Sequence, residues 1–188
     1  MRDKYPDGNV SVTLSELLSY VVSKSDNNAC DILFRLVGGP KKVETYIHSL
    51  GVQRIAITTT EEEMHKGWDI QFTNWCEPFA MLQLLDILYT KKYLSKTSSD
   101  FLWKIMTETS TGSKRMKGLL PSGTLVAHKT GTSDTNEKGI TAATNDVGII
   151  TLPNGKHFAV VVFVANSAAE ENIRERVIAK ITKTLWDY

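Results

Sequence analysis

The sequence predicts an α+β fold, in which a mainly helical region is followed by antiparallel strands that a final helix closes. Three observations support this class. Apolar residues recur at helical spacing through the first half, alternating strand patterns fill the last third, and Pro153-Asn154-Gly155-Lys156 lies between two of these strands as a strong hairpin signal. Helices first and antiparallel strands later is an order typical of α+β domains.

Five segments of the first half have helical periodicity: residues 14–22, 25–37, 40–50, 78–88 and 99–106. Ser25-Asp26 supplies a helix start, Gly38-Gly39 a helix end, and Pro40 a favourable first helical residue. Residues 51–76 have no sustained period and are expected to form a long ordered loop, a feature that often carries function.

Three strands are predicted next, over residues 125–129, 142–152 and 158–165. The third is apolar on both faces, so we expect it to be a central strand covered on both sides. A final helix carries one apolar stripe made of Ile173, Val177, Ile178, Ile181 and Leu185. We therefore predict a helical lobe over residues 1–112, whose glutamate-bearing loop covers about 58–76, and an α/β lobe over 113–188; together they form one structural unit.

Composition excludes several functional classes. The 188 residues are 41% apolar and 23% charged, which excludes disordered and collagen-like chains. With 22 basic and 21 acidic residues the net charge is +1, so we expect no nucleic-acid partner. No apolar run approaches membrane-spanning length, so no membrane insertion is expected. The cysteines and histidines lack metal-ligand spacing, and we expect no metal and no cofactor; whether Cys30 and Cys76 pair stays open.

Two short motifs carry candidate chemistry. Ser25-Asp26-Asn27 stands at a helix start, where it could serve merely as an N-cap. Lys129-Thr130-Gly131-Thr132 ends a predicted strand, and its charge, hydroxyls and glycine suit a closely approaching anionic ligand; alone it could be an ordinary strand end. Together and in this order, the triplets are two of the three elements of class A β-lactamases and penicillin-binding proteins.

On these motifs the chain resembles the class A serine β-lactamases, and the likeness covers nearly its whole length. Residues 25–31, 38–40 and 127–131 look like class A sequence. The segment 61–65, Glu-Glu-Glu-Met-His, and the segment 142–148 resemble the extended-spectrum PER and VEB branch, which includes CfxA-like enzymes. The resemblance implies a β-lactamase/D,D-peptidase-like fold and hydrolysis of β-lactam antibiotics, which confers resistance.

The resemblance also implies catalytic roles. Glu61 falls where the family's loop glutamate activates the hydrolytic water, although three consecutive glutamates could simply solvate a loop. Ser25 would relay a proton to the β-lactam nitrogen, and Lys129 would hold a positive field beside Ser25.

Substrate contacts follow in the same way. Asn27 would bind the substrate's side-chain amide, Thr130 and Gly131 its carboxylate end, and the backbone N–H of Thr132 would supply half of an oxyanion hole. Arg115 stands where the PER and VEB branch also has an arginine, and its guanidinium suits a carboxylate; the alternative is a surface arginine beside other basic residues.

Two residues depart from the commonest class A pattern. His65 and Asp31 each stand where that pattern has asparagine. An ionised Asp31 cannot donate a hydrogen bond, so we expect the glutamate loop to be held differently.

The third class A element, Ser-x-x-Lys, supplies the nucleophile, and no serine of the chain is followed three positions later by lysine. We therefore expect the chain to be N-terminally incomplete and inactive alone, and its full-length parent to be a periplasmic or secreted monomer. A penicillin-binding D,D-peptidase and a non-catalytic fragment remain alternatives; Glu61 favours the β-lactamase, because the peptidases lack this loop glutamate.

Overall fold

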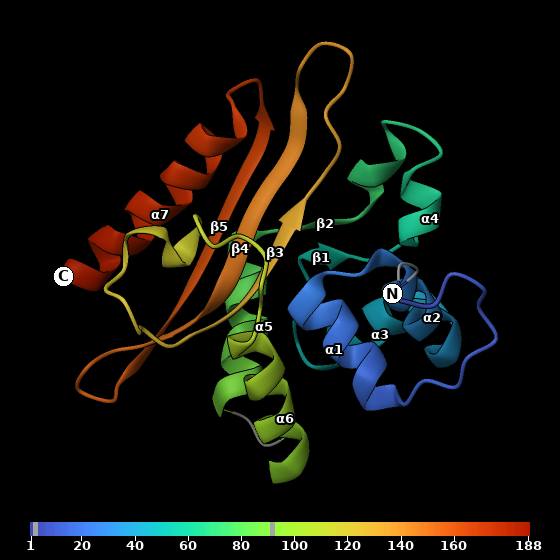
Figure 1. Cartoon of the computed structure of the whole chain (residues 1–188), viewed down its shortest axis with the longest axis horizontal. Coiled ribbons are helices and arrows are strands. Elements are labelled where there is room, and N and C mark those ends of the chain that lie inside the picture. Colours follow the sequence, from blue (N-terminus) through green and yellow to red (C-terminus); the bar gives the residue numbers. More distant parts are fainter. Residues whose placement is uncertain (2–3, 91–92) are drawn as a thin grey trace.

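The computed structural model describes residues 1, 4–90 and 93–188 and has an α+β fold (Figure 1). Its α-helices are α1 (Leu14–Lys24), α2 (Asn27–Val37), α3 (Pro40–Ser49), α4 (Glu61–Met64), α5 (Pro78–Thr90), α6 (Lys96–Thr107) and α7 (Glu171–Asp187). Its strands are β1 (Ile55–Ala56), β2 (Trp75–Cys76), β3 (Val126–Thr132), β4 (Thr141–Thr151) and β5 (His157–Ser167). Two 3-10 helices, η1 (Ile70–Thr73) and η2 (Met116–Leu119), complete the described elements.

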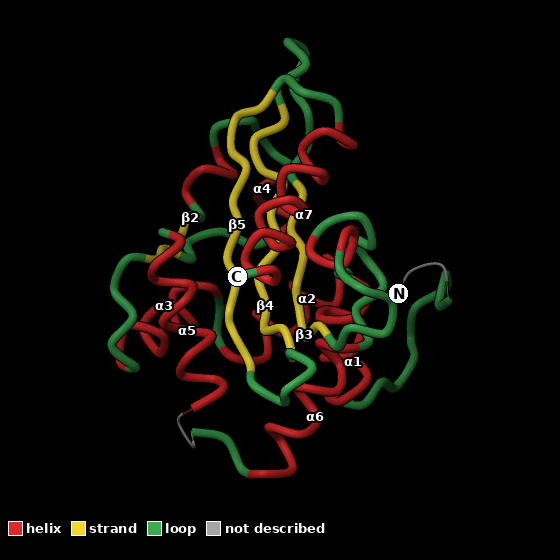
Figure 2. The backbone as a smooth tube through the Cα atoms, turned by 90° about the vertical axis from the view of Figure 1, so that its left-hand side faces the viewer, coloured by secondary structure: helices red, strands yellow, loops and turns green. Residues whose placement is uncertain are grey.

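The antiparallel sheet β3-β4-β5 divides the molecule into layers. One face packs on α7 and η2 through a core that includes Met116, Val126, Ile150 and Ile178. The other face packs on α5 and α6, where Leu85 and Met106 meet Ala127. Figure 1 shows α7 on one side of the sheet and α1–α4 on the other, and Figure 2, turned by 90°, shows α7 in front of the three strands.

Local capping explains why the first two helices begin and end where they do. Thr13 accepts a hydrogen bond from the Glu16 amide at 3.2 Å, while the Glu16 carboxylate accepts from the Thr13 amide at 2.9 Å, which closes a capping box. Ser25 ends α1 in the left-handed conformation with φ 55°, and Asp26 caps α2 by accepting from the Ala29 amide at 2.8 Å. Gly38, with φ 91°, ends α2. These helices confirm the predictions.

Strand β5 is an edge of the described sheet and not its centre, because the strand order is β3-β4-β5. The expectation of a central position was wrong. Both faces of β5 are apolar because α5 covers one and α7 the other, so two covering layers, and not two neighbouring strands, account for the pattern.

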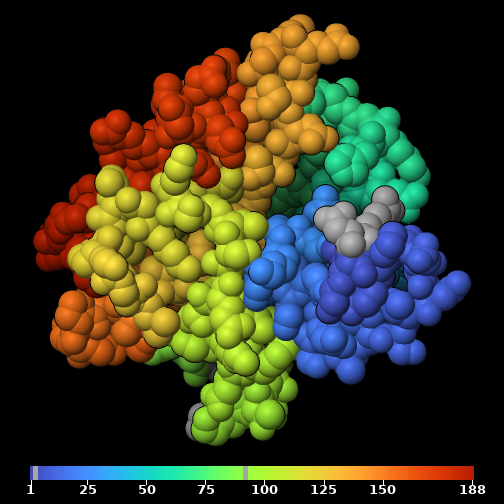
Figure 3. Space-filling view, viewed as in Figure 1, coloured from blue at the N-terminus to red at the C-terminus, as the bar shows by residue number. Residues whose placement is uncertain are grey.

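The apolar stripe predicted for α7 does not face the core, apart from Ile178. Ile173, Val177, Ile181 and Leu185 are 42–52% exposed, whereas Arg174, Ile178, Ala179 and Thr182 form the buried face. Arg174 can be buried because its Nε donates to Thr144 Oγ1 at 2.8 Å and its Nη1 donates to the Ala169 carbonyl. Helix α7 lies along the outside of the molecule in Figure 3.

Residues 51–76 are more regular than expected. The short strands β1 and β2 pair antiparallel, with Ile55 opposite Cys76, and tie the two ends of the segment together. Between them lie α4 and η1, so the prediction of a loop without regular elements was wrong in part. Cys30 and Cys76 are both free thiols. Among the described helices none is long and apolar enough to cross a bilayer.

Candidate active site

Ser25 and Lys129, which stand 104 residues apart in the chain, meet at the junction of the helical region and the sheet. The Lys129 Nζ donates to Ser25 Oγ at 2.6 Å and to the Thr130 carbonyl at 2.6 Å. Ser25 reaches this place because it links α1 to α2. Lys129 reaches it from β3. Asn27 begins α2 with an exposed side chain. The fold thus brings the two triplets together.

Lys129-Thr130-Gly131-Thr132 forms the last four residues of β3, as predicted, although the strand continues to Thr132 and not only to Lys129. Thr130 is buried, and its Oγ1 lies 2.6 Å from Thr111 Oγ1. A Cβ on Gly112 would lie 2.5 Å from Thr130 Cγ2, so a glycine beside this threonine permits a close approach. On the side of β3 that pairs with β4, a Cβ on Gly148 of β4 would lie 2.5 Å from the Ala127 carbonyl oxygen.

Arg115 is 4% exposed, and protein groups engage four of its five N–H donors. Its Nη1 donates to the carbonyls of Gly131 at 3.0 Å and Asn145 at 2.9 Å. Its Nη2 donates to Thr132 Oγ1 at 2.6 Å, and its Nε to Glu175 Oε1 at 3.2 Å. Arg115 therefore joins β3, β4 and α7, and it holds Thr132 directly; its predicted contact with substrate stays a prediction.

Glu61 is the first residue of α4 and lies at the site because Asp31 holds the start of this helix. The Asp31 carboxylate, 6% exposed, accepts from the amides of Glu61 at 2.8 Å and Glu62 at 2.9 Å. Thr60 and Glu63 close a capping box at the same turn. An acid at position 31 anchors the loop by accepting two backbone N–H groups, which an asparagine side chain, with one acceptor oxygen, cannot reproduce in the same way.

Burial and neighbouring charges tune the two titratable groups of the site. Burial, reinforced by the negative charge of Asp31, raises the pKa of Glu61, while Lys129 and His65 act in the opposite direction. Burial lowers the pKa of the Lys129 ammonium, although Cys30, Glu61 and Asp146 oppose this shift. Glu61 and Lys129 therefore act on each other, and burial shifts the pKa of each group in the direction that favours its neutral form.

Two nearby features were not recognised from the sequence. Cys30, on α2, faces the site, and burial together with Glu61 raises the pKa of its thiol to about 12, so it stays protonated. His65 Nδ1 lies 3.3 Å from Asp134 Oδ2, so an exposed ion pair can bridge the segment after α4 and the loop after β3. Nothing in the sequence pairs residues so far apart.

Behind β3 lies a buried pair that the sequence analysis did not predict. His128 and Asp146 are both fully buried, with His128 Nδ1 2.9 Å from Asp146 Oδ1. An available signal was Asp146 itself, a lone acid within the otherwise uncharged predicted strand 142–152.

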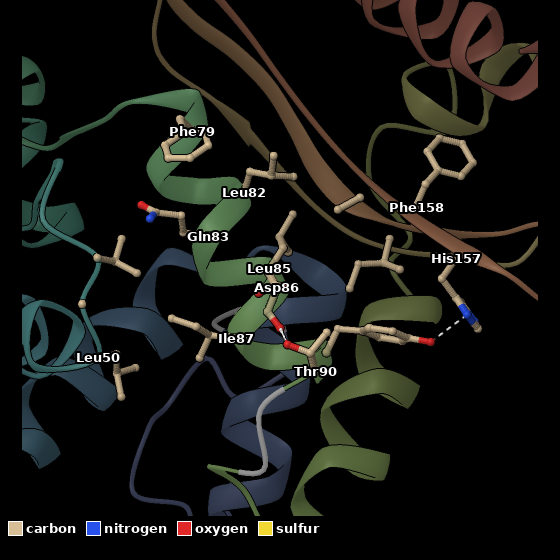
Figure 4. A pocket seen from close by; sticks show the side chains of 15 residues that line it. Leu50, Phe79, Leu82, Gln83, Leu85, Asp86, Ile87, Thr90, His157 and Phe158 are labelled. Atoms are coloured by element: carbon tan, nitrogen blue, oxygen red, sulfur yellow. Dashed lines mark hydrogen bonds between the residues drawn. The ribbon is translucent and has the colours of Figure 1, made fainter.

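A hollow of about 650 Å³ lies away from these residues, between α5, the segment 50–52 and the strands β4 and β5. Its lining is mostly apolar, with Leu82, Leu85, Ile87 and Phe158 among the side chains in Figure 4. Tyr89 Oη lies 2.8 Å from His157 Nδ1 at its edge. The hollow contains none of the motif residues, so we place the candidate site at Ser25, Lys129 and Glu61. No cluster of metal-ligating side chains occurs in the part of the chain that the structure describes.

Comparison with known proteins assigns the chain to a family. Residues 2–188 match the beta-lactamase enzyme family, and the chain belongs to it. The chain is 49% identical over its whole length to "Beta-lactamase VEB-1" of Pseudomonas aeruginosa, and 46% identical over 98% of its length to "Extended-spectrum beta-lactamase PER-1" of the same organism. It covers 63% and 59% of those relatives, so it spans less than two thirds of their length.

The fold is that of class A β-lactamases. The whole chain superposes with a TM-score of 0.98 and 61% identity on the crystal structure of the TLA-1 extended-spectrum β-lactamase, of which it covers 68%. It matches a class A β-lactamase structure from Bacteroides cellulosilyticus with a TM-score of 0.96 and 42% identity. The family and fold expected from the two triplets are confirmed.

Proposed function

We propose that the full-length protein hydrolyses β-lactam antibiotics through an acyl-enzyme, and that Ser25, Lys129 and Glu61 form part of its catalytic site. The observation that carries this proposal is the 2.6 Å contact between Lys129 Nζ and Ser25 Oγ, with Glu61 close enough to act on Lys129. Membership of the β-lactamase family supports it.

The geometry suits proton transfer. Because the Lys129 ammonium donates to Ser25 Oγ, the Ser25 hydroxyl proton is free to move to a leaving nitrogen when the lactam ring opens. The raised pKa of Glu61 makes its carboxylate a stronger base than a free glutamate, which favours proton abstraction from a hydrolytic water.

The remaining motif residues are proposed to bind substrate. Thr130, Gly131 and Thr132 lie along one strand, where hydroxyls and backbone N–H groups can meet the carboxylate and the carbonyl oxygen of a β-lactam. Asn27, exposed at the start of α2, is available to an amide side chain of the substrate. Arg115 is proposed to act on substrate chiefly through Thr132, whose Oγ1 it holds. The full-length protein is proposed to work as a monomer in the periplasm or outside the cell.

Nitrocefin turnover tests the proposal. The 188 residues contain no Ser-x-x-Lys, so we expect no efficient turnover by the chain alone and turnover by a chimera that carries the N-terminal third of VEB-1. Efficient turnover by the isolated chain would contradict the missing nucleophile. A folded chimera that is acylated but never turns over would favour the peptidase alternative.

Glu61 is tested in the same chimera. Glu61→Gln should lower kcat by about 10²–10⁴-fold and leave a covalent adduct that mass spectrometry detects, because deacylation loses its base. Glu62→Gln, a change at the next residue of α4 with an exposed side chain, is the matched control and should keep kcat. Equal kinetics for the two variants would remove Glu61 from the mechanism.

A further inference from the structure

The segment 109–111, which follows α6, contacts both elements that carry the meeting of Ser25 with Lys129. Ser25 lies at the end of α1, and Lys129 lies in β3. Strand β3 is an edge of the described sheet, so the backbone groups along its outer side need partners other than a strand. The segment 109–111 supplies hydrogen-bonding groups to this edge and to α1 at once.

The two threonines of the segment hold β3 on either side of Lys129. Thr109 is buried, and its Oγ1 donates to the His128 carbonyl at 2.7 Å. Thr111 Oγ1 lies 2.6 Å from Thr130 Oγ1. The residue before Lys129 and the residue after it are therefore both bound by the same segment.

Ser110, between the two threonines, holds the end of α1. Its backbone N–H and its Oγ each donate to the Ser23 carbonyl at 3.0 Å. Because α1 ends at Lys24, this carbonyl is one of the last four of the helix, which have no donor within the helix. Ser23 is buried, and its Oγ donates to the Ile105 carbonyl of α6 at 2.6 Å. The helix is thus fixed from outside, two positions before Ser25.

Ser25 depends on such support. Its left-handed conformation, with φ 55°, is one that a residue with a Cβ keeps only when the surrounding structure holds it there. The Lys129 Nζ reaches Ser25 Oγ at 2.6 Å, and a shift of about 1 Å between α1 and β3 would bring this contact to the limit of a hydrogen bond. The contact is therefore sensitive to whatever fixes α1 against β3.

We propose that the segment 109–111 positions Ser25 and Lys129 for proton transfer. Ser110 fixes the end of α1 ahead of Ser25, and the two threonines fix β3 on both sides of Lys129. These three residues act through the groups that they hold and take no part in the chemistry, so they are positioning residues. The proposal rests on the proposed roles of Ser25 and Lys129 and deepens them.

NMR of the 188-residue chain tests the proposal without turnover. The readout is the nuclear Overhauser cross-peak between the Cε protons of Lys129 and the Cβ protons of Ser25. The double variant Thr109→Val/Ser110→Ala removes two hydroxyl donors and adds no charge, so the cross-peak should weaken strongly or disappear. A cross-peak of wild-type intensity in the double variant, or its absence from the wild type, would overturn the proposal.

Two controls separate positioning from a general loss of stability. Thr182→Val on α7 also removes a buried threonine hydroxyl that donates to a carbonyl, here that of Ile178 at 2.9 Å, and it should leave the cross-peak unchanged. The conservative double variant Thr109→Ser/Ser110→Thr keeps both hydroxyls and should restore the wild-type cross-peak. An equal loss in Thr182→Val would contradict a specific role for the segment.

Should the double variant fail to fold, Ser110→Ala decides. The Ser110 side chain is exposed, and the alanine variant keeps the backbone N–H that binds Ser23. Its control is Ser49→Ala on α3, an exposed serine whose Oγ donates to the Tyr46 carbonyl at 2.6 Å. The cross-peak should be weaker in Ser110→Ala than in Ser49→Ala, and equal intensities would overturn the proposal.

The chimera with the N-terminal third of VEB-1 separates this proposal from the proposed function. There Thr109→Val/Ser110→Ala should lower kcat for nitrocefin by about 10–10²-fold, because a small misplacement of reacting groups is costly, whereas Thr182→Val should keep kcat. A chimera that never hydrolyses nitrocefin, together with a cross-peak that is lost in the double variant, would refute the proposed function and leave the positioning role intact. An active chimera with an unchanged cross-peak would refute the positioning role alone.

Discussion

Polar side chains are buried in the layer behind β3, whereas apolar side chains are exposed on the outer face of α7. Arg115, His128 and Asp146 are at most 4% exposed, whereas Ile173, Val177, Ile181 and Leu185 are 42–52% exposed. Hydrogen bonds that cross from one element to another satisfy the Arg115 guanidinium, the Asp146 carboxylate and His128 Nδ1, which offsets the cost of removing them from water, whereas His128 Nε2 is buried with no partner among the described residues. Hydrogen-bonding partners, more than residue type, therefore decide which polar side chains this fold can bury.

The largest effect is expected at Arg115. Arg115→Ala leaves Glu175 and the carbonyls of Gly131 and Asn145 without their donor, so we expect a loss of about 3 kcal/mol or more in the free energy of unfolding, measured with urea. Arg176→Ala removes an exposed arginine from α7 and should change that free energy by about 0.5 kcal/mol or less. Similar losses in the two variants would mean that the Arg115 network contributes little.

An intermediate, pH-dependent effect is expected at Glu61. Its pKa is raised in the folded chain, so the native state binds more protons than the unfolded state, and stability falls as pH rises from the ordinary glutamate range through the raised value. Glu61→Gln removes this loss and should therefore stabilise the chain at pH 7.5 but not at pH values below that range. Melting temperatures at both pH values test this, with Glu62→Gln as the control; a stabilisation independent of pH would contradict the electrostatic cause.

The smallest effect on stability is expected on the outer face of α7. Val177→Lys should change the free energy of unfolding by about 0.5 kcal/mol or less, because Val177 is 42% exposed. Ile178→Ala, one residue further and fully buried, should cost about 2–4 kcal/mol. Urea unfolding measures both free energies, and a loss in Val177→Lys as large as that in Ile178→Ala would contradict the exposure of this face of α7.

Local features were predictable from the sequence, and long-range pairings were not. The helix boundaries at Thr13 and Gly38 follow from caps that lie within a few residues of the helix ends, and the two triplets are recognisable as short strings. The buried side of α7 was not predictable from its pattern, because Arg174 is buried only through partners at Thr144 and Ala169. The meeting of Lys129 with Ser25 followed from the resemblance, and the roles of both residues stay predictions.

The pairing of His128 with Asp146 and the order of the strands in the sheet were likewise not predictable from the sequence. His128 and Asp146 are brought together by a strand register that depends on the whole hairpin, and the edge position of β5 depends on which layers cover it. The pattern of apolar residues along a strand indicates whether its faces are covered. It does not show which helices or strands cover them.

Ser25 joins α1 to α2 with φ 55°, a left-handed conformation that costs a residue with a Cβ about 1–2 kcal/mol relative to glycine. Glycine would therefore suit this junction better than serine if the chain had only to fold. The hydroxyl that meets Lys129 is thus a feature that folding opposes slightly, and random substitution filtered for stability alone would tend to erase it. At this junction, Ser25→Gly is the mutation that costs the backbone least, and it is also the one that removes the hydroxyl bound by Lys129.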